Sequence, residues 1–224
     1  LDSADAETNE SALLLHHQNC PSSGAQRNGR HNALVHKVAK ALEATGGNVY
    51  EEPRNERVRN EKNVRLDFLV TGRPTCATGL GGDIVVCNTN GNAPTLANFL
   101  KNPRLSAQAR MNSTHTRKLR HYREHCRLLG VEMYPLVFNA MGGMETAANS
   151  HAALFKIITD DFIATNQASM GAELAAYSAE QHIRSLRNDL ATTNHTLTAA
   201  LVAAGEAKRM EVILKGRPGY PVVA

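Results

Sequence analysis

The sequence has no tryptophan, few other aromatic residues and only four cysteines. The cysteines, Cys20, Cys76, Cys87 and Cys126, lie far apart and form no CxxC pair. This spacing disfavours a disulfide framework and is typical of a protein from a reducing compartment. We therefore expect all four to be free thiols.

Long apolar runs are also missing. No segment approaches the roughly 18 apolar residues that a membrane-spanning helix needs. The first residues are acidic, with Asp2, Asp5, Glu7 and Glu10, whereas a signal peptide begins with basic residues followed by apolar ones. The sequence predicts neither a membrane span nor secretion, and its 42% of hydrophobic residues predicts a folded, soluble protein.

Acidic residues are scarce in one segment. The net charge of +4 is only mildly basic, but between residues 101 and 127 a lone acid, Glu124, faces eight cations. Such a concentration is typical of a surface that binds a polyanion, because each cation near a phosphate releases a counterion. A solvated basic helix is the alternative. The eight cations are Lys101, Arg104, Arg110, Arg117, Lys118, Arg120, Arg123 and Arg127.

The pattern of apolar residues predicts a mixed α/β protein. A helix, three strands, a helix and a fourth strand follow one another along the chain, and an Ala- and Leu-rich helical region follows them. Pro135 in the fourth strand predicts a sheet edge or a bulge. The predicted strands are 48–52, 64–70, 83–87 and 131–140, and the predicted helices are 32–45, two within 94–130, and then 147–163, 172–190 and 196–204.

Two aspartates stand in otherwise apolar strands. Asp67 and Asp83 would be costly to bury without a partner or a metal ion. Hydrolysis of a phosphodiester needs an activated water and stabilisation of phosphate charge, and Mg²⁺ held by two carboxylates supplies both. The alternatives are that Asp83 begins a strand after two glycines, and that Asp67 pairs with Arg65 or a neighbour.

A lysine and a tyrosine complete the candidate site. Lys118 precedes Tyr122 by four residues, so both side chains lie on one face of the basic helix. The lysine can orient the attacking water or stabilise developing charge, and the tyrosine hydroxyl can hydrogen-bond a phosphate. A surface pair without function is the alternative.

These motifs, in this order, resemble the restriction-like endonuclease domain, of the PD-(D/E)xK superfamily, found in site-specific non-LTR retrotransposons. The resemblance covers roughly residues 30 to 143. Each motif is short, and the order of all six makes the set specific. The motifs are Arg30-His31-Asn32, Glu52-Pro53, Arg65-Leu66-Asp67-Phe68, Asp83-Ile84-Val85-Val86, Lys118 to Tyr122, and Pro135-Leu136-Val137 to Gly142-Gly143.

The resemblance implies a restriction-endonuclease-like mixed sheet flanked by helices, with residues 144–224 as a C-terminal helical extension. It implies a nuclear enzyme that nicks target DNA with Mg²⁺ or Mn²⁺, so that the exposed 3′ hydroxyl primes a reverse transcriptase domain of the same polyprotein on element RNA. Asp67 and Asp83 would bind the metal, and Lys118 and Tyr122 would complete the catalytic set. Expected nucleic-acid contacts are Arg30, His31, Arg117, Arg120 and Arg123.

The sequence departs from the family pattern at three positions. Leu66 stands where a proline commonly precedes the first aspartate, and Val85 stands where the ordinary motif has its lysine, so Lys118 must act in its place. Asn139 occupies a position where many members of that family carry a glutamate. These departures keep open a second hypothesis, an inactive relative that binds nucleic acid or serves in assembly. A third is a helical scaffold whose basic segment binds a protein.

The leader, residues 1–29, holds a possible remnant of a zinc knuckle. His16 and Cys20 have the spacing of its second half, and the first half is missing. We therefore do not expect zinc, although His16 and Cys20 leave the possibility open.

Overall fold

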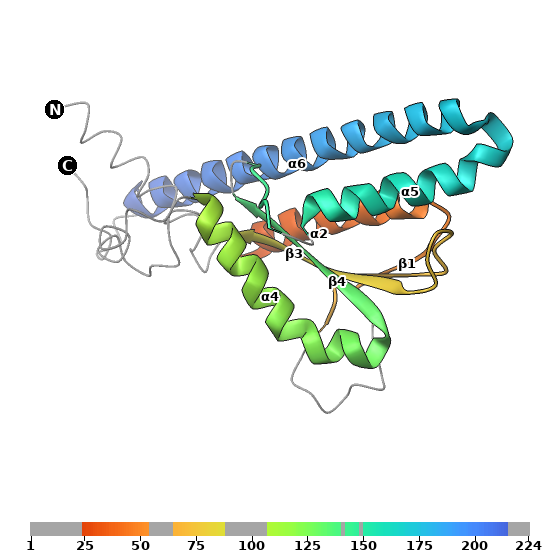
Figure 1. The fold of residues 1–224 in the computed structure, drawn as a ribbon. Helices are drawn as coiled ribbons and strands as arrows, with labels where there is room; N and C mark the ends of the chain where they lie inside the picture. The colour runs from red at the N-terminus through yellow and green to blue at the C-terminus, as the bar shows by residue number, and fades with distance from the viewer. Residues whose placement is uncertain (1–23, 54–64, 88–106, 140–141, 148–149, 215–224) are drawn as a thin grey trace.

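The computed structural model describes residues 24–53, 65–87, 107–139, 142–147 and 150–214 as four helices and one sheet (Figure 1). The elements are α2 (Gly24–Glu43), β1 (Asn48–Glu51), β2 (Phe68–Thr71), β3 (Gly79–Cys87), α4 (Ala107–Leu129), β4 (Val131–Asn139), α5 (His151–Met170) and α6 (Ala172–Leu214). The predicted mixed α/β class is confirmed. In this part of the chain no helix is long and apolar enough to cross a membrane.

The four strands form one mixed sheet in the order β1-β2-β3-β4. The pairs β1–β2 and β2–β3 are antiparallel, and β3 and β4 are parallel. A parallel pair needs a crossover connection, and α4 lies in the connection between these two strands. Pro135 lies in β4, which is an edge strand, as predicted.

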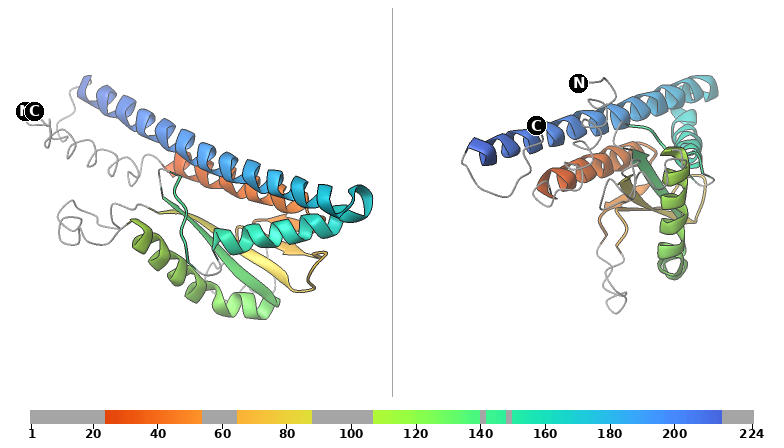
Figure 2. Two further views of the ribbon diagram at one scale, coloured as in Figure 1. Left: turned by 45° about the horizontal axis from the view of Figure 1, so that its top comes forward. Right: turned by 90° about the vertical axis from the view of Figure 1, so that its left-hand side faces the viewer.

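The helices cover both faces of the sheet. Helix α4 lies on one face, whereas α2 and α5 lie on the other, with α6 running along both of them (Figures 1 and 2). The larger core fills the α2 and α5 side, and it includes Leu34, Phe68, Leu136, Leu154 and Leu190. The smaller core, beneath α4, contains Leu66, Tyr122, Cys126 and Met133.

Alternation along the strands decides which face each side chain joins. Phe68 and Val70 of β2 belong to the larger core, and Leu69 packs against the smaller one. Leu66, three residues before Leu69, packs in the smaller core as well, so alternation does not continue before Phe68. Asp83 precedes Ile84 of the larger core within β3, so its side chain falls on the α4 side. The sheet thus presents Asp83 to the helix that carries the basic segment.

Two helices differ from the prediction at their ends. Helix α2 begins at Gly24, so Asn32, the first residue of the predicted helix, lies in its interior, and residues 24–29 are helical and not part of a leader. Helix α6 is continuous where the sequence predicts a break between 190 and 196. Tertiary contacts explain why α6 is continuous. Nδ2 of Asn194 donates to the backbone oxygen of Asn139 (2.6 Å), and Arg30 donates to Oγ1 of Thr198 (2.7 Å). These polar residues interrupt the apolar pattern but face the core and are bonded there.

The C-terminal helices are built into the same core as the sheet. Phe155 and Ile158 of α5 and Leu186 of α6 pack in one cluster with Leu34 and Phe68. The predicted boundary at residue 143 stays a prediction about domain organisation, but α5 and α6 do not stand apart from the sheet.

Strand β3 begins earlier than predicted because its glycines lie beneath large side chains. A Cβ added at Gly82 would overlap the ring of Phe68 on the paired strand. Gly79, Gly81 and Gly82, which read as a linker in the sequence, are therefore strand residues. Any larger residue at position 82 would displace Phe68 from the core.

We expect Gly82→Ala to lower the free energy of unfolding by about 1–3 kcal/mol, because the added methyl overpacks a closed core. Urea unfolding followed by circular dichroism measures the change. Gly29→Ala is the matched control: a Cβ there meets nothing within 4 Å and the residue lies in α2, so stability should stay equal or rise. Equal stabilities of Gly82→Ala and wild type would contradict the close packing.

Candidate active site

The two predicted metal-binding aspartates lie where the regular pairing of β2 and β3 ends, at Phe68 and Gly82. The backbone N–H of Asp67, one residue before β2, donates to the oxygen of Gly82 (2.8 Å), a bond that the regular register does not make. Oδ2 of Asp67 accepts from the N–H of Ile84, the residue after Asp83, and the charge of Asp67 raises the pKa of Asp83. The two carboxylates therefore belong to a single site.

Asp83 is bound by both predicted helix residues. Nζ of Lys118 lies 3.1 Å from Oδ1 and 3.0 Å from Oδ2 of Asp83. The hydroxyl of Tyr122 donates to Oδ1 at 2.6 Å, and the same hydroxyl oxygen lies 3.0 Å from the backbone oxygen of Arg65. The spacing of four residues places both side chains on the inner face of α4, as predicted.

Asp67 is oriented by two other groups. Its Oδ2 accepts a hydrogen bond from the backbone N–H of Ile84 (2.5 Å), and its Oδ1 lies 3.2 Å from Nε2 of His31. The hydrogen bond to Asp67 raises the pKa of His31, and burial of the ring opposes that rise. The structure thus assigns His31, which the sequence predicts as a nucleic-acid contact, a place beside the first aspartate.

Burial and like charge act together on Asp83. Burial raises the pKa of its carboxyl, the charge of Asp67 raises it further, and Lys118 and Tyr122 oppose the rise. Burial and the neighbouring Asp83 raise the pKa of the Tyr122 hydroxyl well above its ordinary value, so Tyr122 stays a hydrogen-bond donor at neutral pH. The site concentrates negative charge and holds its own proton donors.

The rim of the site carries a further ion pair. Glu52 accepts from Arg65 at 2.6 Å, and its backbone N–H donates to the oxygen of Asp67 (2.7 Å). A hollow of about 240 Å³ lies beside this pair, lined by Asn32, Val35, Glu51 and Glu52. Among the described residues of its lining are two acids, Glu51 and Glu52, whose negative charges repel a phosphate.

The donor set at the two aspartates fits a hard divalent ion. Both carboxylates are buried, and among the described residues Oδ2 of Asp83 accepts no hydrogen bond of good geometry although Lys118 lies close to it. Mg²⁺ typically takes one or two protein carboxylates and completes its shell with water and substrate phosphate. No group of three or more acids, histidines or cysteines in the described ranges is arranged around a metal position. Asp67 and Asp83 would therefore hold an ion as a pair.

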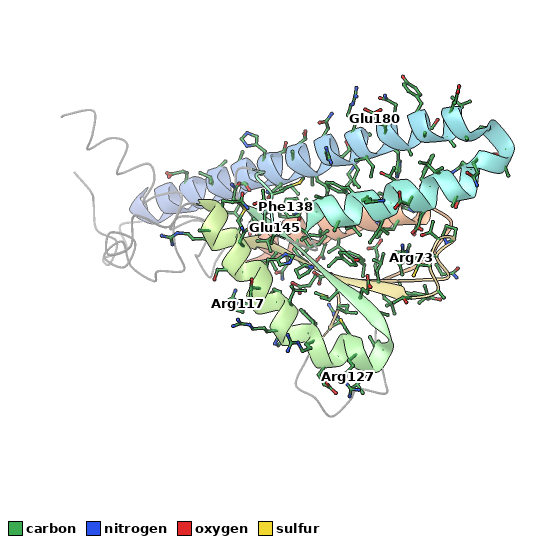
Figure 3. The ribbon with its side chains drawn as sticks, viewed as in Figure 1. Arg73, Arg117, Arg127, Phe138, Glu145 and Glu180 are labelled. Carbon is green, nitrogen blue, oxygen red and sulfur yellow. The ribbon has the colours of Figure 1, made fainter. Side chains whose placement is uncertain are left out.

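The remaining predicted nucleic-acid contacts fall into two classes. Arg117, Arg120 and Arg123 are exposed on α4, and Arg117 projects from the side of the helix away from the sheet (Figure 3). Arg30 is instead buried, with its guanidinium bonded to Thr198 of α6. In this arrangement Arg30 joins α2 to α6 and offers no free charge to a phosphate.

A second buried cluster was missed by the sequence analysis. Glu145 lies 3.4 Å from Nδ1 of His115 and 2.8 Å from Nδ1 of His151, and its Oε2 accepts from the N–H of Val137 (2.9 Å). All three side chains are nearly inaccessible. None of these three residues belongs to a recognisable motif. The one indication of the cluster in the sequence is an acid that lies between two isolated histidines. The cluster joins α4, β4 and the first turn of α5.

Asn139 closes the turn after β4. Its Oδ1 accepts from the N–H of Gly143 (2.8 Å), and it pairs with Cys87 across the parallel strands, whereas Asp83 pairs with Pro135. Four residues of strand separate these levels, about 13 Å. Asn139 therefore contributes nothing to the pair of aspartates, and neither would a glutamate held at the same level.

The predictions about the cysteines and about the zinc-knuckle remnant have different outcomes. Cys76, Cys87 and Cys126 are free thiols, as predicted, and burial raises the pKa of Cys87 and of Cys126 to about 11. Cys20 and His16, the predicted remnant of a zinc knuckle, lie outside the described residues. So do Lys101 and Arg104 and the predicted first helix of the basic region.

Comparison with models of protein families gives no match, and a search among curated proteins finds no match either.

We expect Glu145→Gln to destabilise the protein by about 2–3 kcal/mol at pH 7, because it removes a buried charge that several donors satisfy. Burial raises the pKa of Glu145, but the bonds from His115 and His151 outweigh it and hold that pKa below its ordinary value of 4.5. A depressed carboxyl pKa stabilises the fold above pH 4.5, and this contribution is lost as pH falls through the folded-state pKa. Urea unfolding between pH 3.5 and 7 measures the difference from wild type.

The difference between wild type and Glu145→Gln should shrink as the pH falls below about 4.5. Glu180→Gln is the control, because Glu180 is exposed on α6 and its loss should change stability little at any pH. A pH-independent difference at position 145 would show that the charge of Glu145 does not matter.

Proposed function

We propose that this chain is a divalent-metal-dependent DNA endonuclease of the restriction-endonuclease-like kind. The observation that carries the proposal is that Lys118 of α4 binds Asp83, while Asp67, just before β2, binds the N–H of Ile84, the residue after Asp83. Three short motifs, spread over some fifty residues of sequence, supply one buried carboxylate pair and one amine. The mixed sheet with helices on both faces is compatible with that fold.

The residues of the site divide the work of phosphodiester hydrolysis. A divalent ion held by Asp67 and Asp83 would lower the pKa of a bound water and stabilise charge on the phosphate. Tyr122 holds Asp83 through its hydroxyl, and the N–H of Ile84 fixes Asp67. Lys118, a quarter exposed, reaches the same place and can donate to the water or to a phosphate oxygen.

The exposed face of α4 supplies the contacts to the substrate. Arg120, Arg123 and Arg127 follow at spacings of three and four residues, so they line one side of the helix, and Lys118 lies on its inner side. Lys118 and Tyr122 lie on the opposite side of α4, so DNA held by these arginines would be bound about one helix diameter, roughly 10 Å, from the site. In the setting implied by the resemblance, the nick would prime a reverse transcriptase domain on element RNA in the nucleus.

A second function has its own support. Both aspartates already have protein partners, His31 for Asp67 and Lys118 for Asp83, and such a network is stable without an ion. An inactive relative that binds nucleic acid or assists assembly would keep the same contacts. Only cleavage distinguishes the two hypotheses.

We expect wild-type protein to convert supercoiled plasmid to the nicked form with Mg²⁺ or Mn²⁺, and not with EDTA. Asp83→Asn should lower the rate at least about 100-fold, because the pair that holds the ion is broken. Glu180→Gln replaces an exposed carboxylate on α6 and should cut like wild type. Equal rates for wild type and Asp83→Asn would assign the cutting to a contaminant, and no cutting by any of the proteins would favour the inactive relative.

The double variant Arg120→Ala, Arg123→Ala should bind DNA more weakly, and the slope of log affinity against log salt should fall by about 2, since each lost phosphate contact releases about one counterion fewer. Fluorescence anisotropy at several salt concentrations measures both quantities. Arg184→Ala, an exposed arginine on α6, is the control and should leave the slope unchanged. An affinity that does not depend on salt would favour the protein-binding scaffold.

A further inference from the structure

We propose that Lys118 is an internal counter-cation of the two-aspartate site, and that a divalent ion binds by exchange with it. In this proposal the lysine neutralises Asp83 in the metal-free protein and leaves it when the ion arrives. The inference rests on the metal site of the proposed function and adds a resting state to it.

The contacts of Lys118 show how it can neutralise Asp83 in the metal-free protein. Its Nζ lies 3.1 Å and 3.0 Å from the two oxygens of Asp83, so it straddles the carboxylate. The side chain of Asp83 is 7% exposed, and the carboxylate of Asp67 binds the N–H of the next residue, Ile84. Two neighbouring buried carboxylates repel each other, and an isolated pair would destabilise the fold. The lysine supplies the positive charge that the metal-free fold requires.

The two oxygens of Asp83 show why the ion and Lys118 exclude each other. Oδ1 accepts from both Tyr122 and Lys118, whereas Oδ2 accepts no hydrogen bond of good geometry from the described residues, although Lys118 lies 3.0 Å away. Oδ2 is therefore the oxygen best placed to bind an ion. A lysine ammonium has no lone pair and cannot share the ion as a ligand. Two positive groups within a few ångströms of each other repel strongly at low dielectric. The ion and the lysine therefore compete for Oδ2.

The location of Lys118 makes the exchange possible. Its side chain is 25% exposed and flexible, so the amine can swing toward solvent while α4 stays in place. Tyr122, one helical turn away, keeps its bond to Oδ1 and continues to hold the carboxylate. The released amine stays beside the site, where a substrate phosphate would meet it.

The test is Mn²⁺ binding to the full chain, measured by calorimetry and by electron paramagnetic resonance of the free ion. Lys118→Met keeps the length of the side chain and removes its charge, so it should bind Mn²⁺ on the order of tenfold more tightly than wild type. Lys156→Met, which removes an exposed cation on α5, should bind like wild type. Thermal unfolding should show Lys118→Met less stable than wild type without metal, and more strongly stabilised by Mn²⁺.

A measurement on the wild-type protein covers the case in which Lys118→Met fails to fold. The ¹³Cε resonance of Lys118 should shift on addition of Mg²⁺, whereas that of Lys156 should not. Equal or weaker Mn²⁺ binding by a folded Lys118→Met, or a Lys118 resonance that ignores Mg²⁺, would overturn the exchange. Metal exchange without plasmid nicking would overturn the proposed function alone.

Discussion

The closeness of Asp67 and Asp83, where the pairing of β2 and β3 ends, is the constraint on which the rest of the site depends. Two neighbouring buried carboxylates need positive charge or hydrogen-bond donors close by. The chain supplies these from three directions: the backbone of Ile84, the imidazole of His31 and the amine of Lys118. Burying two carboxylates lowers the stability of the fold relative to apolar residues at both positions, which would pack without partners. A functional role for the pair explains why the chain keeps it.

Helix α4 serves two purposes because of its place in the topology. It lies in the connection between the parallel strands β3 and β4, so one of its faces must cover the sheet. That face carries Lys118 and Tyr122, and the opposite face is free to carry arginines. A single helix thus joins the candidate catalytic groups to the candidate DNA surface, and the buried contact of His115 with Glu145 anchors it close to Lys118.

The sequence predicts the main residues of the candidate site, but fewer of the contacts that hold them in place. Asp67, Asp83, Lys118 and Tyr122 could be named because each sits in a short motif, and because the order of these motifs resembles that of a known endonuclease family. The bond of His31 to Asp67 could not, because it depends on how α2 crosses the sheet. The helix and strand types were predictable from apolar periodicity.

Tertiary contacts account for the features that were not predictable. Arg30 reads as a surface cation, yet Thr198 of α6 binds it inside the fold, far away in the sequence. Glu145 and its two histidines follow no spacing rule, because their elements meet only in the folded protein. Periodicity reports the direction of a side chain within its own element and carries no information on which distant element it meets.

The most direct test of the central claim is a crystal structure of the protein soaked in Mn²⁺, with anomalous diffraction used to locate the ion. We expect one strong peak within about 2.2 Å of oxygens of both Asp67 and Asp83, at the usual ligand distance of a small divalent ion. A peak elsewhere, or carboxylates that face separate surfaces, would contradict it.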